Sequence, residues 1–161
     1  MRDPESTTYT GAIETAEEFG LRLYTEAWRR GWEWATLRIV IGDGALWIWN
    51  LADLHFPGAI QIVDLYHARQ HLWAVAALLF PNQSAQRNRW IVSPQRLLDQ
   101  GRIESLIKRL RTIRSENDEV AQKLSLEAEY FARNAARMRY PDFASLDYSS
   151  VPAWLKPAAK R

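Results

Sequence analysis

Two apolar runs decide the fold, Leu37-Arg38-Ile39-Val40-Ile41 and Ala59-Ile60-Gln61-Ile62-Val63. Both are short and rich in β-branched side chains, which is typical of strands that are covered on both faces. Between them, residues 45–56 carry apolar side chains at helical spacing and end before Pro57-Gly58. The order strand, helix, strand fits one βαβ crossover, so we expect two parallel strands joined by a right-handed connection.

The rest of the chain is predicted to be mostly helical. We expect helices over residues 14–32, 65–80, 84–98 and 102–114, and Pro94 leaves open whether the third of these is continuous. Ser115 is expected to cap a last helix that runs to about residue 138. The chain then divides into residues 1–80 with the strands, a helical region over 81–140, and a proline-bearing tail over 141–161 that we expect to be irregular and disordered.

Composition bounds the class of protein. The 161 residues are 47% hydrophobic and 25% charged, as in a globular domain, and no apolar run approaches the ~20 residues that would span a bilayer. The chain has no cysteine, which excludes disulfides and thiolate metal sites, and its polar N-terminus does not resemble a signal peptide. We therefore expect a cytoplasmic protein, nucleoid-associated if it binds DNA. The net charge of +2 permits a nucleic-acid partner without arguing for one.

Eight tryptophans are many for a chain of this size. Large aromatic side chains bury much apolar area, so we expect most of them in a core or an interface rather than in a base-stacking surface.

The first candidate site is Asp43, which lies between Gly42 and Gly44 just after the first predicted strand. The carboxyl edge of a parallel sheet is where ligands bind in open α/β folds, and the glycines leave the carboxylate uncovered. An aspartate at this place can equally cap the helix that starts at Ala45, and spacing alone favours the cap.

The second candidate site is Asp64-Leu65-Tyr66-His67, at the end of the second predicted strand. Asp64, His67 and His71 lie on one helical face, so they could in principle bind a metal. The pattern lacks a glutamate between the histidines, and we favour a helix cap with a hydrogen-bonded histidine.

The helix predicted over residues 102–114 carries basic side chains away from its apolar stripe. Lys108, Arg109, Arg111 and Arg114 are candidates for contacts with DNA phosphates, although their spacing favours a solvated helix face.

Residues 10–20, 42–50 and 55–69, and later 127–131 and 134–141, closely resemble the ISKra-type bacterial insertion-sequence transposases. The resemblance runs from about Arg2 to Pro141. It implies a DDE-type catalytic core with an RNase H-like fold, in which Asp43 matches the second acid. Asp64 and His67 match the DxxH pattern shared with Mutator-like transposases, and the helical block resembles the insertion that precedes the third acid.

This family cleaves and joins DNA strands with Mg²⁺ or Mn²⁺ held by three acids, since in-line displacement at phosphorus uses two metal ions bound by carboxylate oxygens. In this sequence the first acid would lie upstream of Met1, and the sequence after Pro141 does not resemble the family. We therefore expect an internal fragment, in which Asp43 is the one metal ligand of the triad and no metal is stably bound, and which is inactive alone.

Loss of the strand that pairs with residues 37–41 would leave an open apolar edge, which predicts self-association. Two alternatives stay open: a regulatory fragment that binds DNA or inhibits the full-length transposase, and a metal-dependent hydrolase using Asp43, Asp64 and His67. None of these readings involves a membrane.

Overall fold

The computed structural model describes residues 9–146, which form seven α-helices, two short 3-10 helices and two strands. These residues fall into two compact units. The first contains residues 9–40, 45–61 and 146, and the second contains residues 41–44 and 62–145. Each strand begins in the first unit and ends in the second.

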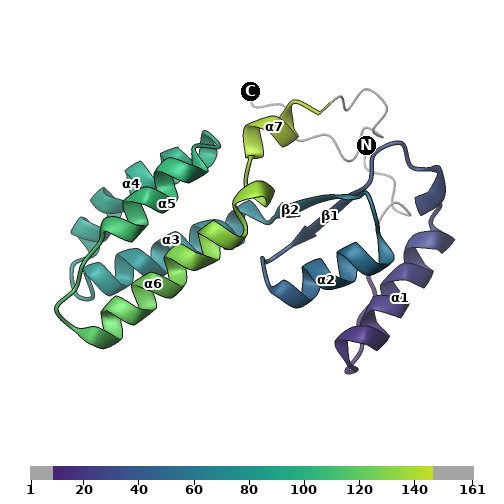
Figure 1. Cartoon of the computed structure of the whole chain (residues 1–161), viewed down its shortest axis with the longest axis horizontal. Coiled ribbons are helices and arrows are strands. Elements are labelled where there is room, and N and C mark those ends of the chain that lie inside the picture. Colours follow the sequence, from purple (N-terminus) through teal and green to yellow (C-terminus); the bar gives the residue numbers. More distant parts are fainter. Residues whose placement is uncertain (1–8, 147–161) are drawn as a thin grey trace. The chain divides into compact units, whose positions relative to one another are not determined.

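The two strands, β1 (Ile39–Gly42) and β2 (Ile60–Val63), form a two-stranded sheet. The Ile60 N–H donates to the Arg38 carbonyl (2.9 Å), and the Asp64 N–H donates to the Gly42 carbonyl (2.8 Å). From the first bond to the second, both strands advance by four residues in the same direction along the chain, so the strands run parallel. Helix α2 (Leu46–His55) connects them, and the predicted βαβ unit is confirmed (Figure 1).

Helix α1 (Ala16–Arg29) is shorter at both ends than the 14–32 predicted. It begins at a capping box, in which the Thr15 side chain accepts from the Glu18 N–H and the Glu18 carboxylate accepts from the Thr15 N–H. It ends before Gly31, whose φ of 79° breaks the helical path. A 3-10 helix, η2 (Trp32–Trp34), follows.

Helices α1 and α2 approach closely at Gly20. A Cβ atom at this position would lie 2.7 Å from Leu51 Cδ2 and 2.8 Å from His55 Nε2. The missing side chain therefore sets the distance between the two helices. Around this contact Trp49, Leu51, Ala52 and Phe56 are buried.

Of the described tryptophans, which we expected in a core or an interface, only Trp49 is fully buried in the core. Trp49 is 1% exposed, but Trp34 is 81%, Trp47 46%, and Trp28 and Trp73 are each 40% exposed. Trp154 lies outside the described residues. Since α2 is apolar around most of its circumference, one face of it is covered and Leu46, Trp47 and Leu54 stay on the other.

The second unit is built on four helices: α3 (Leu65–Leu79), α4 (Ser84–Asp99), α5 (Ile103–Thr112) and α6 (Asp118–Arg133). α3 packs against α4 and α6, and α5 packs against the same two (Figure 1). The side chains buried in this unit include Leu72, Val75, Ala76, Ile91, Leu98, Ile103, Leu106, Leu110, Leu124, Phe131 and Met138.

The structure decides one open point of these helices and corrects another. α4 continues through Pro94, whose ring is fully buried, so packing outweighs the missing hydrogen bond. The N-cap of α6 is Asn117 and not Ser115. Asn117 Oδ1 accepts from the Val120 N–H, while Ser115 Oγ accepts from the Asn117 N–H.

The C-terminal elements also differ from the prediction. α6 ends at Arg133, and a 3-10 helix, η3 (Ala135–Arg137), replaces its expected last turn. A short helix, α7 (Tyr140–Ala144), occupies the start of the stretch expected to be irregular, with Pro141 in its first turn, where no backbone N–H is needed. The expected disorder of the remaining tail concerns residues that lie largely outside those described.

The observed fold is thus mostly helical with one small parallel strand pair. No helix within residues 9–146 combines the length and apolar character needed to cross a membrane.

Two leucines on α6 test this packing. Leu124 is 5% exposed and Leu126 is 65% exposed. We predict that Leu124→Ala lowers the free energy of unfolding by about 2–4 kcal/mol, because it leaves a cavity between α5 and α6. The matched Leu126→Ala should change it by less than about 0.5 kcal/mol. Urea unfolding followed by circular dichroism measures both, and equal losses would contradict the packing described.

Candidate functional site

The loop that follows β1 is held by two side chains from α6 and its C-terminal end. The Tyr130 hydroxyl donates to the Asp43 carbonyl (2.8 Å), and Asn134 Nδ2 donates to the Gly44 carbonyl (3.1 Å). Asn134 is fully buried, and its side chain also donates to the Tyr130 carbonyl (3.1 Å). The backbone at Asp43 is therefore fixed by residues about ninety positions further along the chain.

Gly44 is required at this place for two reasons. Its φ of 96° is unfavourable for any residue with a side chain. A Cβ atom would also lie 2.7 Å from Tyr130 Cε2 and 2.8 Å from its hydroxyl oxygen. The positive φ and the close approach of Tyr130 are thus two separate constraints on this position.

Asp43 is not the N-cap of α2. That position belongs to Ala45, which provides no side-chain cap. Gly44 lies between the two, so Asp43 is two residues before the N-cap position. The alternative that spacing favoured for Asp43 is therefore wrong.

Asp64 caps α3, as predicted. Its Oδ1 accepts from the His67 N–H at 3.0 Å. The end of β2 is also held by the Tyr140 hydroxyl, which donates to the Val63 carbonyl (3.1 Å). The ends of both strands are thus tied to the segment that contains Tyr130 and Tyr140.

The predicted acids line one depression, of about 350 Å³, at the carboxyl ends of the strands. Its lining residues are Ile41, Gly42, Asp43, Asp64, Tyr66, His67 and Gln70. The structure therefore places Asp43, Asp64 and His67 around the same hollow, as expected for the edge of a parallel sheet.

His71 lies beside the depression in a network of its own. Its Nδ1 lies 2.7 Å from Glu127 Oε2, and its ring stacks on Tyr130 with the centroids 3.6 Å apart. The ring of His67 meets that of His71 edge-on, at 5.3 Å. The favoured reading of a capped helix with a hydrogen-bonded histidine is confirmed.

Two tyrosines at this edge, Tyr130 and Tyr140, have hydroxyl pKa values above the ordinary one. Burial raises the pKa of the Tyr130 hydroxyl well above its ordinary value, and the nearby charges of Asp43 and Glu127 raise it further. Burial likewise raises the pKa of Tyr140. Both hydroxyls are therefore held neutral, as donors to the backbone.

The fit of these residues to a metal ion is incomplete. Among residues 9–146, no three His, Asp or Glu side chains lie close enough together to hold a metal. Asp64 also uses one carboxylate oxygen as a helix cap. Asp43 and Asp64 could contribute to a metal site that further ligands complete, but these residues do not make one themselves.

The predicted DNA-contacting residues divide into two groups. Lys108 is exposed on α5. Arg109 turns towards α4, where its Nη1 donates to Ser93 Oγ (2.6 Å) and its guanidinium carbon lies 5.8 Å from the Trp90 ring centroid.

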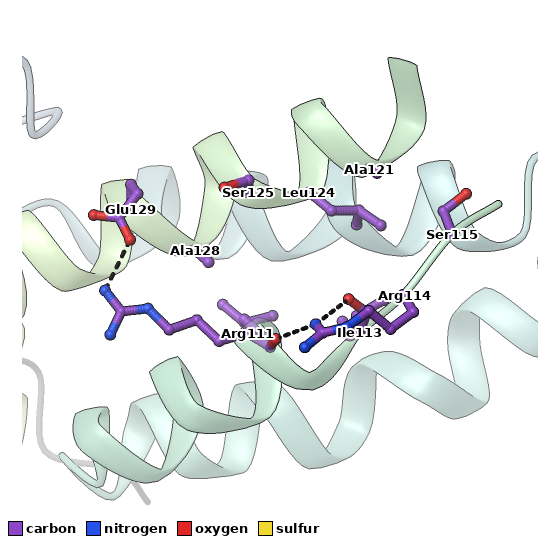
Figure 2. Close-up of a pocket in the computed structure, with 10 residues that line it drawn as sticks. Arg111, Ile113, Arg114, Ser115, Ala121, Leu124, Ser125, Ala128 and Glu129 are labelled. Atoms are coloured by element: carbon purple, nitrogen blue, oxygen red, sulfur yellow. Dashed lines mark hydrogen bonds and ion pairs between the residues drawn. The ribbon is translucent and has the colours of Figure 1, made fainter. Parts of the chain in front are cut away.

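Arg111 and Arg114 are engaged in contacts within the chain, as Figure 2 shows. Arg111 Nη2 lies 2.8 Å from Glu129 Oε1 on α6. Arg114 Nη1 donates to the carbonyls of Arg111 (2.6 Å) and Ile113 (3.1 Å), and so satisfies the end of α5. Both line a groove of about 270 Å³ between α5 and α6, whose floor includes Leu110 and Leu124.

Sequence reasoning missed the residues that hold the edge, Tyr130, Asn134 and Tyr140. Their side chains bond to backbone carbonyls far away in the sequence, which no local pattern encodes. The one available signal is that Asn134 follows Phe131 and Tyr130 at helical spacing, where an amide that becomes buried needs hydrogen-bond partners.

Comparisons with known proteins assign no family. The chain matches no family model, no curated protein and no solved structure.

We predict that stability falls at alkaline pH because of the two tyrosines. A folded-state pKa above the ordinary value means that the neutral phenol is favoured in the folded protein. This contribution is complete below pH ~10 and is lost as the pH rises further. Urea midpoints measured between about pH 8 and 11 should therefore fall, and less so in Tyr130→Phe. Tyr66→Phe, at a 71% exposed position, should follow the wild type. Equal pH profiles for all three proteins would contradict the assignment.

Proposed function

We propose that the chain is a segment of the catalytic region of a DDE-type insertion-sequence transposase and that it is inactive alone. The observation that carries the proposal is the depression where the ends of two parallel strands bring Asp43, Asp64 and His67 together. Asp43 would be the second acid of the triad, with Asp64 and His67 as supporting residues. The finer assignment, a remnant of an RNase H-like sheet followed by a helical insertion, belongs to the same proposal.

The family resemblance of the sequence supports this reading independently of the geometry. In the intact family, Mg²⁺ or Mn²⁺ supplies the electrophilic assistance for strand cleavage and transfer, and DNA ends are the substrate. This chain's own part would be to hold one acid at a fixed edge position. That part is supported by the bonds from Tyr130 and Asn134 to the loop backbone.

A chimera tests the proposal. Residues 2–141 would replace the matching segment of an active ISKra-type transposase, and transposition of its element would be counted in cells. We expect the chimera to transpose, and Asp43→Asn to lower the frequency at least ~100-fold, the order that losing one transition-state stabiliser costs. Asp53→Asn is the matched control, because it makes the same chemical change at an exposed aspartate of α2. Asp53 accepts a hydrogen bond from Gln61 and does not line the depression.

Two outcomes would contradict the proposal. One is equal transposition by the Asp43 and Asp53 variants of the chimera. The other is metal-dependent DNA hydrolysis by the isolated chain that requires Asp43, Asp64 and His67, which would favour a hydrolase complete in itself.

A second candidate is a regulatory fragment that associates with itself or with a full-length transposase. The observation that favours it is exposed apolar surface. Within the described residues β1 pairs only with β2, and Ile41 on β1 is 63% exposed. In the first unit, Leu21, Tyr24 and Trp28 follow one another along α1 and are 37–59% exposed. Exposed strand edges and apolar stripes of this kind are typical of surfaces that bind another chain.

Light scattering tests this second candidate. We predict a mass above that of one chain at ~100 µM, shifting towards one chain when Ile41→Lys places a charge on the strand edge. Val92→Lys is the control, because Val92 is equally exposed (63%) on α4. A monodisperse single chain, with cooperative unfolding, would rule the association out.

A further inference from the structure

The sequence separates its charges in an unusual way. Residues 65–98 contain four arginines and no aspartate or glutamate. These residues make up α3 and nearly all of α4. The acid that ends the stretch, Asp99, is engaged by Arg69, with Arg69 Nη2 at 2.8 Å from Asp99 Oδ1. The surface formed by α3 and α4 therefore has no carboxylate of its own that is left unpaired.

Helix α4 carries an exposed row of polar side chains, Arg89, Ser93 and Arg96, spaced one helical turn apart. We call this row the α4 stripe. Neither Arg89 nor Arg96 has an ion pair or a hydrogen-bond partner within the described part of the chain. Their charges are therefore available to an outside partner.

A third guanidinium joins the stripe from α5. Arg109 reaches Ser93 Oγ and lies over the Trp90 ring, which fixes it beside the stripe. The other exposed polar residues of α4 before Asp99 are neutral and include Gln86 and Asn88. Arginines interspersed with hydroxyl and amide side chains are the set that contacts phosphate oxygens along a nucleic-acid backbone.

Arg111 and Arg114 are poorer phosphate ligands than the residues of the stripe. Glu129 neutralises the charge of Arg111, and Arg114 bonds back to the carbonyls at the end of α5, as Figure 2 shows. A phosphate would have to compete with these contacts. Arg109 differs from both, because the group it contacts, the Ser93 hydroxyl, is neutral and belongs to the stripe itself. The basic residues suited to an outside partner therefore lie on α4 rather than at the end of α5.

We propose that the α4 stripe, with Arg109, is a surface that binds the phosphate backbone of double-stranded DNA. The inference rests on the proposed function for the choice of DNA as the polyanion, whereas the stripe itself is defined by charge and geometry. An anionic membrane is the poorer fit, because the apolar side of α4, with Ile91, Pro94 and Leu98, is buried within the unit.

Fluorescence anisotropy with a labelled duplex of arbitrary sequence, about 20 base pairs long, tests the proposal over ~50–200 mM salt. Arg89→Gln/Arg96→Gln is compared with Arg111→Gln/Arg114→Gln, which removes the same two charges. We expect the stripe variant to bind about tenfold more weakly at low salt and to lose about 2 from the slope of log affinity against log salt. The matched variant should stay within about twofold of the wild type. Thermal unfolding of each variant shows that it is folded.

A conservative pair sharpens the result. Arg89→Lys/Arg96→Lys keeps the charge and should retain most of the binding, since phosphate contacts tolerate either cation. Equal loss in both glutamine variants would mean that net charge alone matters, and would overturn the proposal. So would the absence of wild-type binding, or preference for phosphatidylserine vesicles or single-stranded RNA over the duplex. The chimera readout depends on Asp43, so DNA binding can fail while the transposase proposal stands, and the reverse.

Discussion

The bonds from Tyr130 and Asn134 to the Asp43–Gly44 backbone are the interactions on which the second unit of this protein depends. Each is a side-chain donor to a backbone carbonyl, worth on the order of 1 kcal/mol. Their importance lies in what they join, because they fix the turn after β1 to a helix about ninety residues later. Gly44 is the complement, since only a residue without a Cβ atom leaves room for the Tyr130 ring. The edge carrying Asp43 is therefore built by the helical region as much as by the sheet.

Because of these bonds, the helical region and the ends of the two strands form one packed unit. α3 carries His71, which stacks on Tyr130 and contacts Glu127, so α3 and α6 meet directly beside the edge. Tyr140 holds the end of β2 in the same way that Tyr130 holds the turn after β1. Elsewhere in the unit, α6 and α4 differ in whether their charged side chains are paired. Glu127 and Glu129 of α6 contact His71 and Arg111, while Arg89 and Arg96 of α4 have no ion pair within residues 9–146.

The sequence predicts what depends on local periodicity. Two β-branched runs around one amphipathic segment give the βαβ unit, and the residues after each strand give the edge with Asp43 and Asp64. Local rules also place the Asp64 cap correctly, but they fail at the start of α6. There Ser115 and Asn117 are both good caps, and the choice depends on which N–H each accepts from. Sequence could not give Tyr130 and Asn134 their partners, because contacts across ninety residues depend on tertiary packing. It could not separate Arg111 from Arg96 either, since both look like solvated basic residues until Glu129 is placed beside one of them.

Nuclear Overhauser effects between Tyr130 and Gly44 report whether the side chain of Tyr130 on α6 holds the turn after β1. A Cβ atom on Gly44 would touch the Tyr130 ring, so a Gly44 α-proton must lie close to the ring protons. We expect a strong cross-peak between them and a ring-current shift of that α-proton, with the cross-peak retained in Tyr140→Phe. No cross-peak, with random-coil shifts at Gly44, would mean that Tyr130 does not hold this turn.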